Sequence, residues 1–294
     1  MNNIKTNSFK AWMLAARPKT LAGAAVPVLI GCGLAYSENV FQLIPSIICF
    51  LFAFVMQIDA NFINDYFDFK KGDDREDRLG PERACAQGWI TLQAMKKGIT
   101  ITSILACSIG SCILFYADSI MIIVGLLCVL FAFLYTTRLG HLGLGDILVL
   151  IFFGLVPVCG TFYVMAHSLT WEVIIASLAC GLVIDTLLMV NNYRDREQDK
   201  KSNKRTIVVR YGEKAGQQLY LLLGITGTGL CLFFIPKGHI WAAFLPQLYL
   251  IFHLSTWKEM THICQGKKLN IILGKTSRNM LLFGILLTLG FILK

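Results

Sequence analysis

The sequence predicts an all-α polytopic membrane protein, folded as one bundle of nine transmembrane helices. Of its 294 residues, 55% are hydrophobic and only 15% are charged. The apolar residues are gathered in long runs, as expected for helices that cross a lipid bilayer. The loops on one side are very short and the conspicuous polar loops all fall on the other, so residues 1–294 are predicted to form a single transmembrane domain with a cap on one side.

Each predicted span is a run of apolar residues bounded by polar ones. The first run holds Gly23, Pro27, Gly31 and Gly33, but Gly and Pro are common in transmembrane helices. In chain order, the predicted spans are residues 20–36, 40–58, 98–116, 119–135, 147–166, 171–190, 216–235, 240–257 and 279–293.

The basic residues predict the orientation of these spans. With nine spans, 25 of the 27 Lys and Arg residues fall on the side of the N-terminus, and only Lys237 and Lys294 fall on the other side. Because basic loops are retained in the cytoplasm, the N-terminus is expected there and the C-terminus outside. We expect a multi-pass protein of the bacterial cytoplasmic (inner) membrane. The predicted cytoplasmic cap loops are about residues 59–97, 136–146, 191–215 and 258–278.

The net charge of +9 belongs to loops that lie beside anionic lipid, so it indicates no nucleic-acid partner.

Two similar polar stretches follow the second and the sixth span. They read Asn64-Asp65-Tyr66-Phe67-Asp68 and Asn191-Asn192-Tyr193-Arg194-Asp195. Their spans point the same way, which indicates a parallel internal repeat. Acidic residues at a membrane boundary are costly, so both stretches are candidate functional sites.

Helical spacing places the polar side chains of each stretch on one face. At about 100° per residue, Gln57, Asn61, Asn64, Asp65 and Asp68 fall within an arc of about 100°. Asp185, Asn192, Asp195 and Asp199 share a face by the same spacing. Asp59 lies nearly opposite Asp68, which favours a role in helix packing. For Asp185, packing and function both stay open.

Oxygen ligands without His or Cys suit Mg²⁺, which is usually held by one or two carboxylates together with substrate phosphates. The predicted partner is therefore a phosphate-rich substrate. Nearby basic side chains would bind the remaining phosphate oxygens, Arg through paired hydrogen bonds and Lys as a point charge. The candidates are Lys70, Lys71, Arg75, Arg78, Arg83, Arg138, Lys204 and Arg205. For residues 75–78, a solvated loop with internal ion pairs is an equal alternative.

The two acidic stretches resemble the motifs of the intramembrane aromatic prenyltransferases of the UbiA superfamily. Flanking segments are most similar to those of its 1,4-dihydroxy-2-naphthoate polyprenyltransferases. These segments are Ala16-Arg17-Pro18-Lys19-Thr20-Leu21, Asp77-Arg78-Leu79-Gly80-Pro81, Gly143-Leu144-Gly145-Asp146, Phe152-Phe153-Gly154-Leu155, Asp195-Arg196-Glu197 and Lys204-Arg205-Thr206. The resemblance covers nearly the whole chain. It implies nine helices around a central cavity, with the acidic motifs at the cytoplasmic mouth.

The resemblance also implies an activity. A polyprenyl group would pass from polyprenyl diphosphate to the hydroxylated aromatic acid 1,4-dihydroxy-2-naphthoate, with decarboxylation, to give demethylmenaquinol for menaquinone biosynthesis. Mg²⁺ would be the cofactor. The implied catalytic residues are Asn64, Asp68, Asp195 and Asp199; the metal ligands are these four with Asp65 and Asp74. The implied substrate-binding residues are Arg83, Arg138, Lys71, Lys204, Arg17, Lys19 and Asn192.

Several details stay open at this level. Gly72 stands where some relatives have a third aspartate, so Asp73 or Asp74 would replace it. The segment 135–143 is shorter than usual, which leaves the alignment of Arg138 open. Arg17 or Lys19 would bind the acceptor carboxylate or only anchor the chain at the membrane. Other acceptors, such as 4-hydroxybenzoate, homogentisate or a haem or chlorophyll ring, are an alternative, and so is a transporter with acidic sites near mid-membrane.

Overall fold

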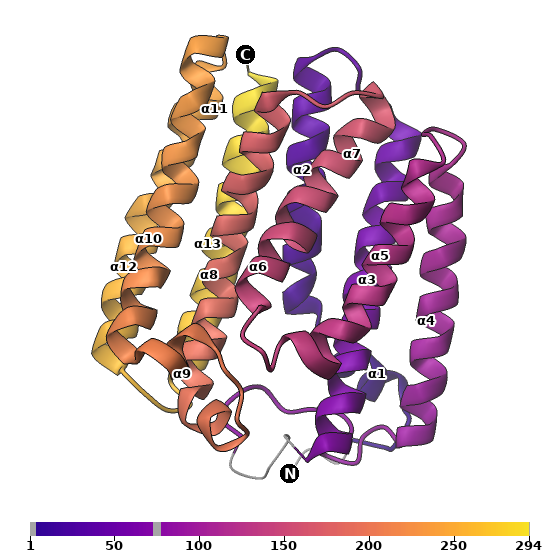
Figure 1. The fold of residues 1–294 in the computed structure, drawn as a ribbon, viewed down its shortest axis with the longest axis vertical. Coiled ribbons are helices and arrows are strands. Elements are labelled where there is room, and N and C mark those ends of the chain that lie inside the picture. Colours follow the sequence, from indigo (N-terminus) through magenta and orange to yellow (C-terminus); the bar gives the residue numbers. More distant parts are fainter. Residues whose placement is uncertain (1–3, 73–77, 294) are drawn as a thin grey trace.

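The computed structural model describes residues 4–72 and 78–293, and every regular element in these ranges is helical. The main helices run along one common direction, so the described chain forms a helical bundle (Figure 1). In chain order, the α-helices are α1 (Phe9–Ala16), α2 (Leu21–Ser37), α3 (Leu43–Lys71), α4 (Leu92–Ile113), α5 (Ile120–Leu134), α6 (Gly145–Val149), α7 (Val156–Ala166), α8 (Trp171–Lys201), α9 (Ile207–Tyr211), α10 (Glu213–Cys231), α11 (Ile240–Phe244), α12 (Leu248–Ile263) and α13 (Leu269–Ile292). The predicted all-α membrane fold is confirmed.

Short segments of tighter or wider helix join some of these elements. The 3₁₀ segments are η1 (Pro18–Thr20), η4 (Leu232–Lys237) and η5 (Leu245–Gln247). The π-helical segments are η2 (Tyr135–Leu139) and η3 (Leu150–Leu155).

The number of membrane spans is lower than predicted when it is judged by helix length and composition. In the described part of the chain, six helical stretches are long and apolar enough to cross a membrane, and α1 with α2 makes a seventh if this pair, bent by 55°, counts as one span. The other predicted spans fall on α4, which carries Lys96 and Lys97 near its start, and on α11 to α12. The count of nine and the cytoplasmic side of the N-terminus stay predictions.

Helices α3 and α8 are longer than a bilayer requires. They have 29 and 31 residues, which at 1.5 Å per residue is about 43 and 46 Å, against a hydrocarbon core of about 30 Å. Gly72, in a left-handed conformation with φ of 76°, ends α3 as expected from the sequence. The two acidic stretches therefore continue their spans as helix and extend beyond the apolar part of each span.

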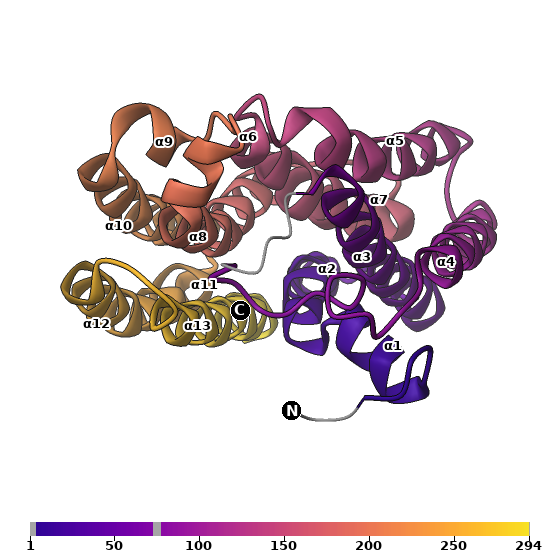
Figure 2. The same ribbon diagram turned by 90° about the horizontal axis from the view of Figure 1, so that it is seen from below.

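Helix α8 lies in the interior of the bundle, beside α10 and α13 (Figure 2). It also packs closely on η3 through two glycines. A Cβ atom on Gly154 would lie only 2.8 Å from Cα of Gly181, so the two backbones are in direct contact. This contact fixes Phe152 and Phe153, the residues just before Gly154, close to α8.

Candidate active site

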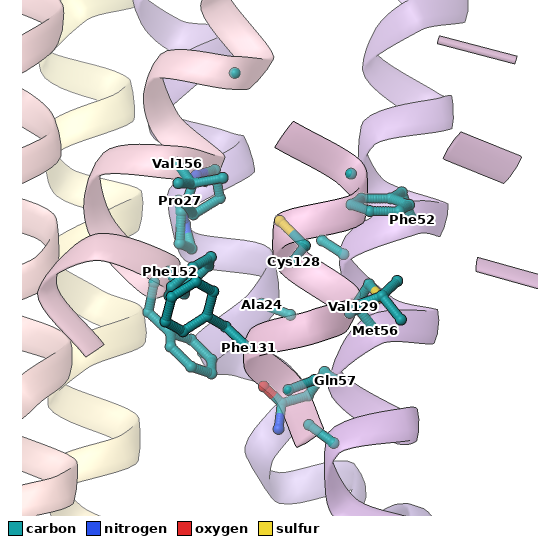
Figure 3. Close-up of a pocket in the computed structure, with 18 of the residues that line it drawn as sticks. Ala24, Pro27, Phe52, Met56, Gln57, Cys128, Val129, Phe131, Phe152 and Val156 are labelled. Carbon is teal, nitrogen blue, oxygen red and sulfur yellow. The ribbon is translucent and has the colours of Figure 1, made fainter. Parts of the chain in front are cut away.

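Two cavities with different linings meet inside the bundle. An apolar cavity of about 590 Å³ lies among α2, α3, α5, η3 and α7, and a polar cavity of about 280 Å³ adjoins it. Figure 3 shows part of the apolar lining, including Phe52, Met56, Phe131 and Phe152. Among the described residues, both cavities are lined by Arg17, Thr20, Asn64, Tyr135, Leu188 and Asn191. A ligand bound across this junction would have one polar and one apolar part.

The acidic ends of α3 and α8 form two walls of the polar cavity. Asn64 and Asp68 are one turn apart on α3, and both line this cavity. From α8 come Asn192, Asp195 and Asp199. The two stretches that are similar in sequence therefore face the same cavity from two helices.

Each of the three acids in this cavity has a basic partner. Asp68 pairs with Arg83 at 3.1 Å, and Asp199 pairs with Lys204 at 3.4 Å. Asp195 accepts two hydrogen bonds from Arg194, at 2.7 and 2.6 Å. Removing one partner from a buried pair leaves an uncompensated charge, so these pairs hold the acids in place before any ligand binds.

Basic residues outnumber acidic ones around the polar cavity. Of the described residues that line it, six are Lys or Arg and three are Asp. The basic ones are Arg17, Arg78, Arg83, Arg194, Lys201 and Lys204. A cleft with this excess of positive charge attracts anions, and diphosphate is the anion class that both Arg and Lys bind well.

Asp199 lies about 13 Å along α8 from the predicted end of its span at residue 190. Burial raises the pKa of Asp199 to about 6, although nearby Lys204 acts in the opposite direction. Its Oδ2 atom is buried and has no hydrogen-bond partner among the described residues. A buried oxygen without a partner costs free energy, and a bound cation would remove that cost.

The oxygen ligands of this cavity suit a Mg²⁺ ion that protein and substrate phosphates hold together. They fit less well a metal ion bound by protein side chains alone. Within the described ranges, no group of three or more His, Cys, Asp or Glu residues is placed to hold a metal ion. The oxygens of Asn64, Asp68, Asp195 and Asp199 nevertheless surround one cavity. Mg²⁺ is usually bound by one or two carboxylates and completes its octahedral shell with water and phosphate oxygens. These four residues would hold it in that way.

Most of the predicted site residues are brought together. The polar cavity is lined by Asn64, Asp68, Asp195, Asp199, Arg83, Lys204, Arg17 and Asn192. Asp73 and Asp74 lie outside the described residues, and the side chain of Lys19 is likewise not described.

Asp65 is not brought into the cavity, although it was a predicted metal ligand. It is fully buried, and its two carboxylate oxygens accept hydrogen bonds from the backbone N–H groups of Ala84 and Cys85 at 2.9 and 3.0 Å. Its carboxylate therefore fixes the turn that follows Arg83. By helical spacing, Asp65 lies about 60° further around α3 than Asp68, at the edge of the predicted stripe.

We expect Asp65→Ala to act mainly on stability. Loss of the carboxylate leaves two buried N–H groups without acceptors, at a cost of about 1–3 kcal/mol each. The melting temperature of the detergent-solubilised protein should fall clearly, and turnover should fall less than in a variant of Asp68. A melting temperature equal to that of the unchanged protein would contradict the turn-fixing role, and complete loss of turnover in a normally folded variant would restore the metal-ligand assignment.

Two predicted substrate-binding bases also lie away from the cavities. The Nζ atom of Lys71 donates hydrogen bonds to the carbonyl oxygens of Thr136 and Thr137, both at 2.9 Å. Arg138 is exposed on η2 and lines neither cavity. Lys71 therefore fixes η2 against α3, and this contact holds Thr136 beside Asn64, to which the Thr136 hydroxyl donates a hydrogen bond.

Some lining residues were not among the predicted site residues. Tyr135 and Asn191 line both cavities, and His141 and Gln198 line the polar one. Asn191 belongs to the second acidic stretch, so its position in that motif was the available signal. Tyr135 ends an apolar run, and nothing in its spacing separates it from an interfacial tyrosine. Its place follows from the π-helical turn of η2.

The two deeper aspartates have different surroundings. Asp59 accepts hydrogen bonds from the hydroxyl groups of Thr102 and Ser103 on α4, which agrees with the expected packing role. Asp185 is buried on α8 and lines neither cavity. The acids that face the cavity lie at the ends of α3 and α8, not at their centres, which argues against a transporter with acids near mid-membrane.

Comparisons with known proteins agree with this arrangement. The chain matches the UbiA prenyltransferase family over residues 24–266. It is 33% identical over 298 residues to the 1,4-dihydroxy-2-naphthoate octaprenyltransferase of Haemophilus influenzae, covering 97% of this chain and 96% of that protein. It is 37% identical over 232 residues to the enzyme of the same name from Escherichia coli, covering 76% and 75%.

Solved structures share the fold at low sequence identity. A UbiA homolog from Archaeoglobus fulgidus bound to GPP and Mg²⁺ gives a TM-score of 0.70 at 15% identity, covering 97% of this chain and 100% of that one. The apo structure of a UbiA homolog from Aeropyrum pernix K1 also gives 0.70 at 15% identity, covering 92% and 97%. With the sequence match over most of its length, this chain belongs to the UbiA prenyltransferase family.

Proposed function

We propose that this protein transfers a polyprenyl group from polyprenyl diphosphate to 1,4-dihydroxy-2-naphthoate, with loss of the carboxyl group as CO₂, to give demethylmenaquinol. One observation carries the proposal: a basic, carboxylate-bearing cavity opens directly into an apolar one. A prenyl diphosphate has this same division between a charged head and an apolar tail. The relatives named for this acceptor support the choice of naphthoate.

The polar cavity would bind the diphosphate. Arg83 and Lys204 would donate to phosphate oxygens, and Asn64, Asp68, Asp195 and Asp199 would hold Mg²⁺ against the same group. When bound, Mg²⁺ would neutralise the charge that builds on the departing diphosphate. The acids and bases that pair with each other in this structure would separate when substrate binds. The acids would then contact the metal, and the bases would contact phosphate. This exchange keeps every charge compensated through binding.

The apolar cavity would take the tail and exclude water from the reacting carbon. Exclusion of water matters because an allylic cation is quenched by hydrolysis. Arg17 lines both cavities, and its Nη2 atom lies 4.0 Å from the buried Oδ2 atom of Asp65. Its guanidinium would bind the carboxylate of an aromatic acid at the junction. The expected location is the bacterial cytoplasmic membrane, with the polar cavity facing the cytoplasm.

The acceptor is tested by supplying membranes that contain the protein with polyprenyl diphosphate, Mg²⁺ and one aromatic acid at a time. We expect mass spectrometry to detect a prenylated, decarboxylated product from 1,4-dihydroxy-2-naphthoate. Membranes without the protein are the control. Product only from 4-hydroxybenzoate or homogentisate would overturn the acceptor, and no prenylated product from any acid would overturn the enzyme assignment.

A further inference from the structure

Two phenylalanine rings lie beside the junction of the two cavities. Phe131 on α5 and Phe152 on η3 line the apolar cavity, with ring centroids 4.9 Å apart and ring planes at 32°. Figure 3 shows the two rings side by side. Phe131 precedes Tyr135, which lines both cavities, by one helical turn and so shares its face. Along the axis of α5, Phe131 therefore lies about 6 Å from Tyr135, toward the apolar cavity.

The backbone around the pair fixes its position. Phe152 belongs to the π-helical segment η3, and the contact between Gly154 and Gly181 seats that segment directly on α8. Both rings are half-buried, so the cavity reaches part of their surface. Single π-helical turns inside α-helices occur frequently at functional sites. The pair is thus held before any substrate binds.

The proposed reaction needs cation stabilisation at this place. When the C1–O bond of the prenyl diphosphate breaks, its electron pair leaves with the diphosphate oxygen, and positive charge spreads over the allylic carbons. The diphosphate stays among the bases of the polar cavity, so the allylic cation forms on the apolar side. Among the described residues that line the apolar cavity, Arg17 is the only charged one, so no carboxylate there faces the cation.

We propose that Phe131 and Phe152 are catalytic residues whose ring faces stabilise the allylic cation formed in the proposed prenyl transfer. The negative face of an aromatic ring attracts a cation, most strongly where water is excluded, and it donates neither a proton nor a bonding electron pair. The cation therefore survives until the acceptor attacks. A π-electron pair of the acceptor ring then forms the C–C bond to C1, and the electron pair of the bond to the departing CO₂ returns to the ring.

The test replaces Phe152 with phenylalanines that carry one, two or three fluorine atoms. Fluorine withdraws electron density from the ring face and changes its shape little, so it separates electrostatics from packing. The single-turnover rate of prenyl transfer should fall with each added fluorine, by on the order of tenfold to a hundredfold in total. Phe152→Leu should lose a similar factor, and Phe152→Trp should recover much of it. The affinity for a polyprenyl thiolodiphosphate, which ionises poorly, should stay unchanged.

Phe291 provides a matched control. It is fully buried on α13, its ring centroid lies 5.0 Å from that of Phe234, and it lines neither cavity. The same fluorine series at Phe291 should change the rate less than about twofold. An equal rate through the series at Phe152 overturns the inference, and so does a fall in rate that is matched by loss of analogue affinity.

The proposed function is tested separately, by measuring prenyl transfer with the unchanged protein. If it prenylates no aromatic acid, the proposed function fails. The role of the rings is still measured then by the slow hydrolysis of polyprenyl diphosphate without an acceptor. In that reaction diphosphate leaves, water adds to the allylic cation and loses a proton to give the polyprenol, and the rate reports ionisation. If the unchanged protein is active but the fluorine series is flat, only the cation-stabilising role fails.

Discussion

Replacing Asp68 with asparagine is expected to lower prenyl transfer by about a hundredfold to a thousandfold while the protein stays folded in the membrane. Asp68 lines the polar cavity and pairs with Arg83 at 3.1 Å. Asparagine keeps the side-chain shape and one oxygen to accept from Arg83, but it removes the negative charge that Mg²⁺ requires. An alanine at this position would instead leave the largely buried Arg83 guanidinium without that partner.

Asp195→Asn should give a loss of the same order, because the two acids face the cavity from different helices and neither can replace the other. Arg194 beside it is buried and also donates to Asn270, so the isosteric change again protects the fold. Asp118→Asn is the control: this exposed acid accepts a hydrogen bond from Tyr163, far from both motifs in the sequence. Near-normal turnover in either Asp68→Asn or Asp195→Asn would refute the metal assignment.

The positions of the helices and the grouping of the acids were predictable from sequence. Long apolar runs have few structural alternatives, and a fixed angle of about 100° per residue places Asn64 and Asp68 on one face of α3. The number of spans was less predictable. Broken stretches such as α11 to α12, which the 3₁₀ segment η5 with Pro246 separates, appear in the sequence as one continuous apolar run.

Within the site, contacts between segments distant in sequence determine which of the predicted residues face the cavity. Helical spacing alone does not determine this. Helical spacing includes Asp65 in the acidic stripe, but the turn at Ala84 and Cys85 uses both of its oxygens. The sequence predicts Lys71 to be a phosphate-binding base, but in the structure its Nζ atom donates hydrogen bonds to two carbonyl groups of η2. Each of these partners lies at least nineteen residues away in the chain, so no local sequence pattern predicts them.

Removal of the metal is expected to abolish turnover and to weaken diphosphate binding less. With EDTA in excess, prenyl transfer should fall by on the order of a thousandfold and return when Mg²⁺ is added beyond the chelator. The reason is the charge balance of the polar cavity, where the described lining has six basic and three acidic residues. The bases alone can attract a prenyl diphosphate, but its leaving group then lacks the divalent charge that helps the C–O bond to break.

The experiment therefore measures two quantities on one sample: the single-turnover rate, and the affinity for a polyprenyl thiolodiphosphate, each with and without Mg²⁺. Ca²⁺ serves as the control cation, because it prefers longer bonds and more ligands than Mg²⁺ and should restore binding better than turnover. Turnover that persists after exhaustive chelation would show that the basic residues suffice. Asp68, Asp195 and Asp199 would then serve to hold their basic partners in place, and the loss expected for Asp68→Asn would have to come from a displaced Arg83.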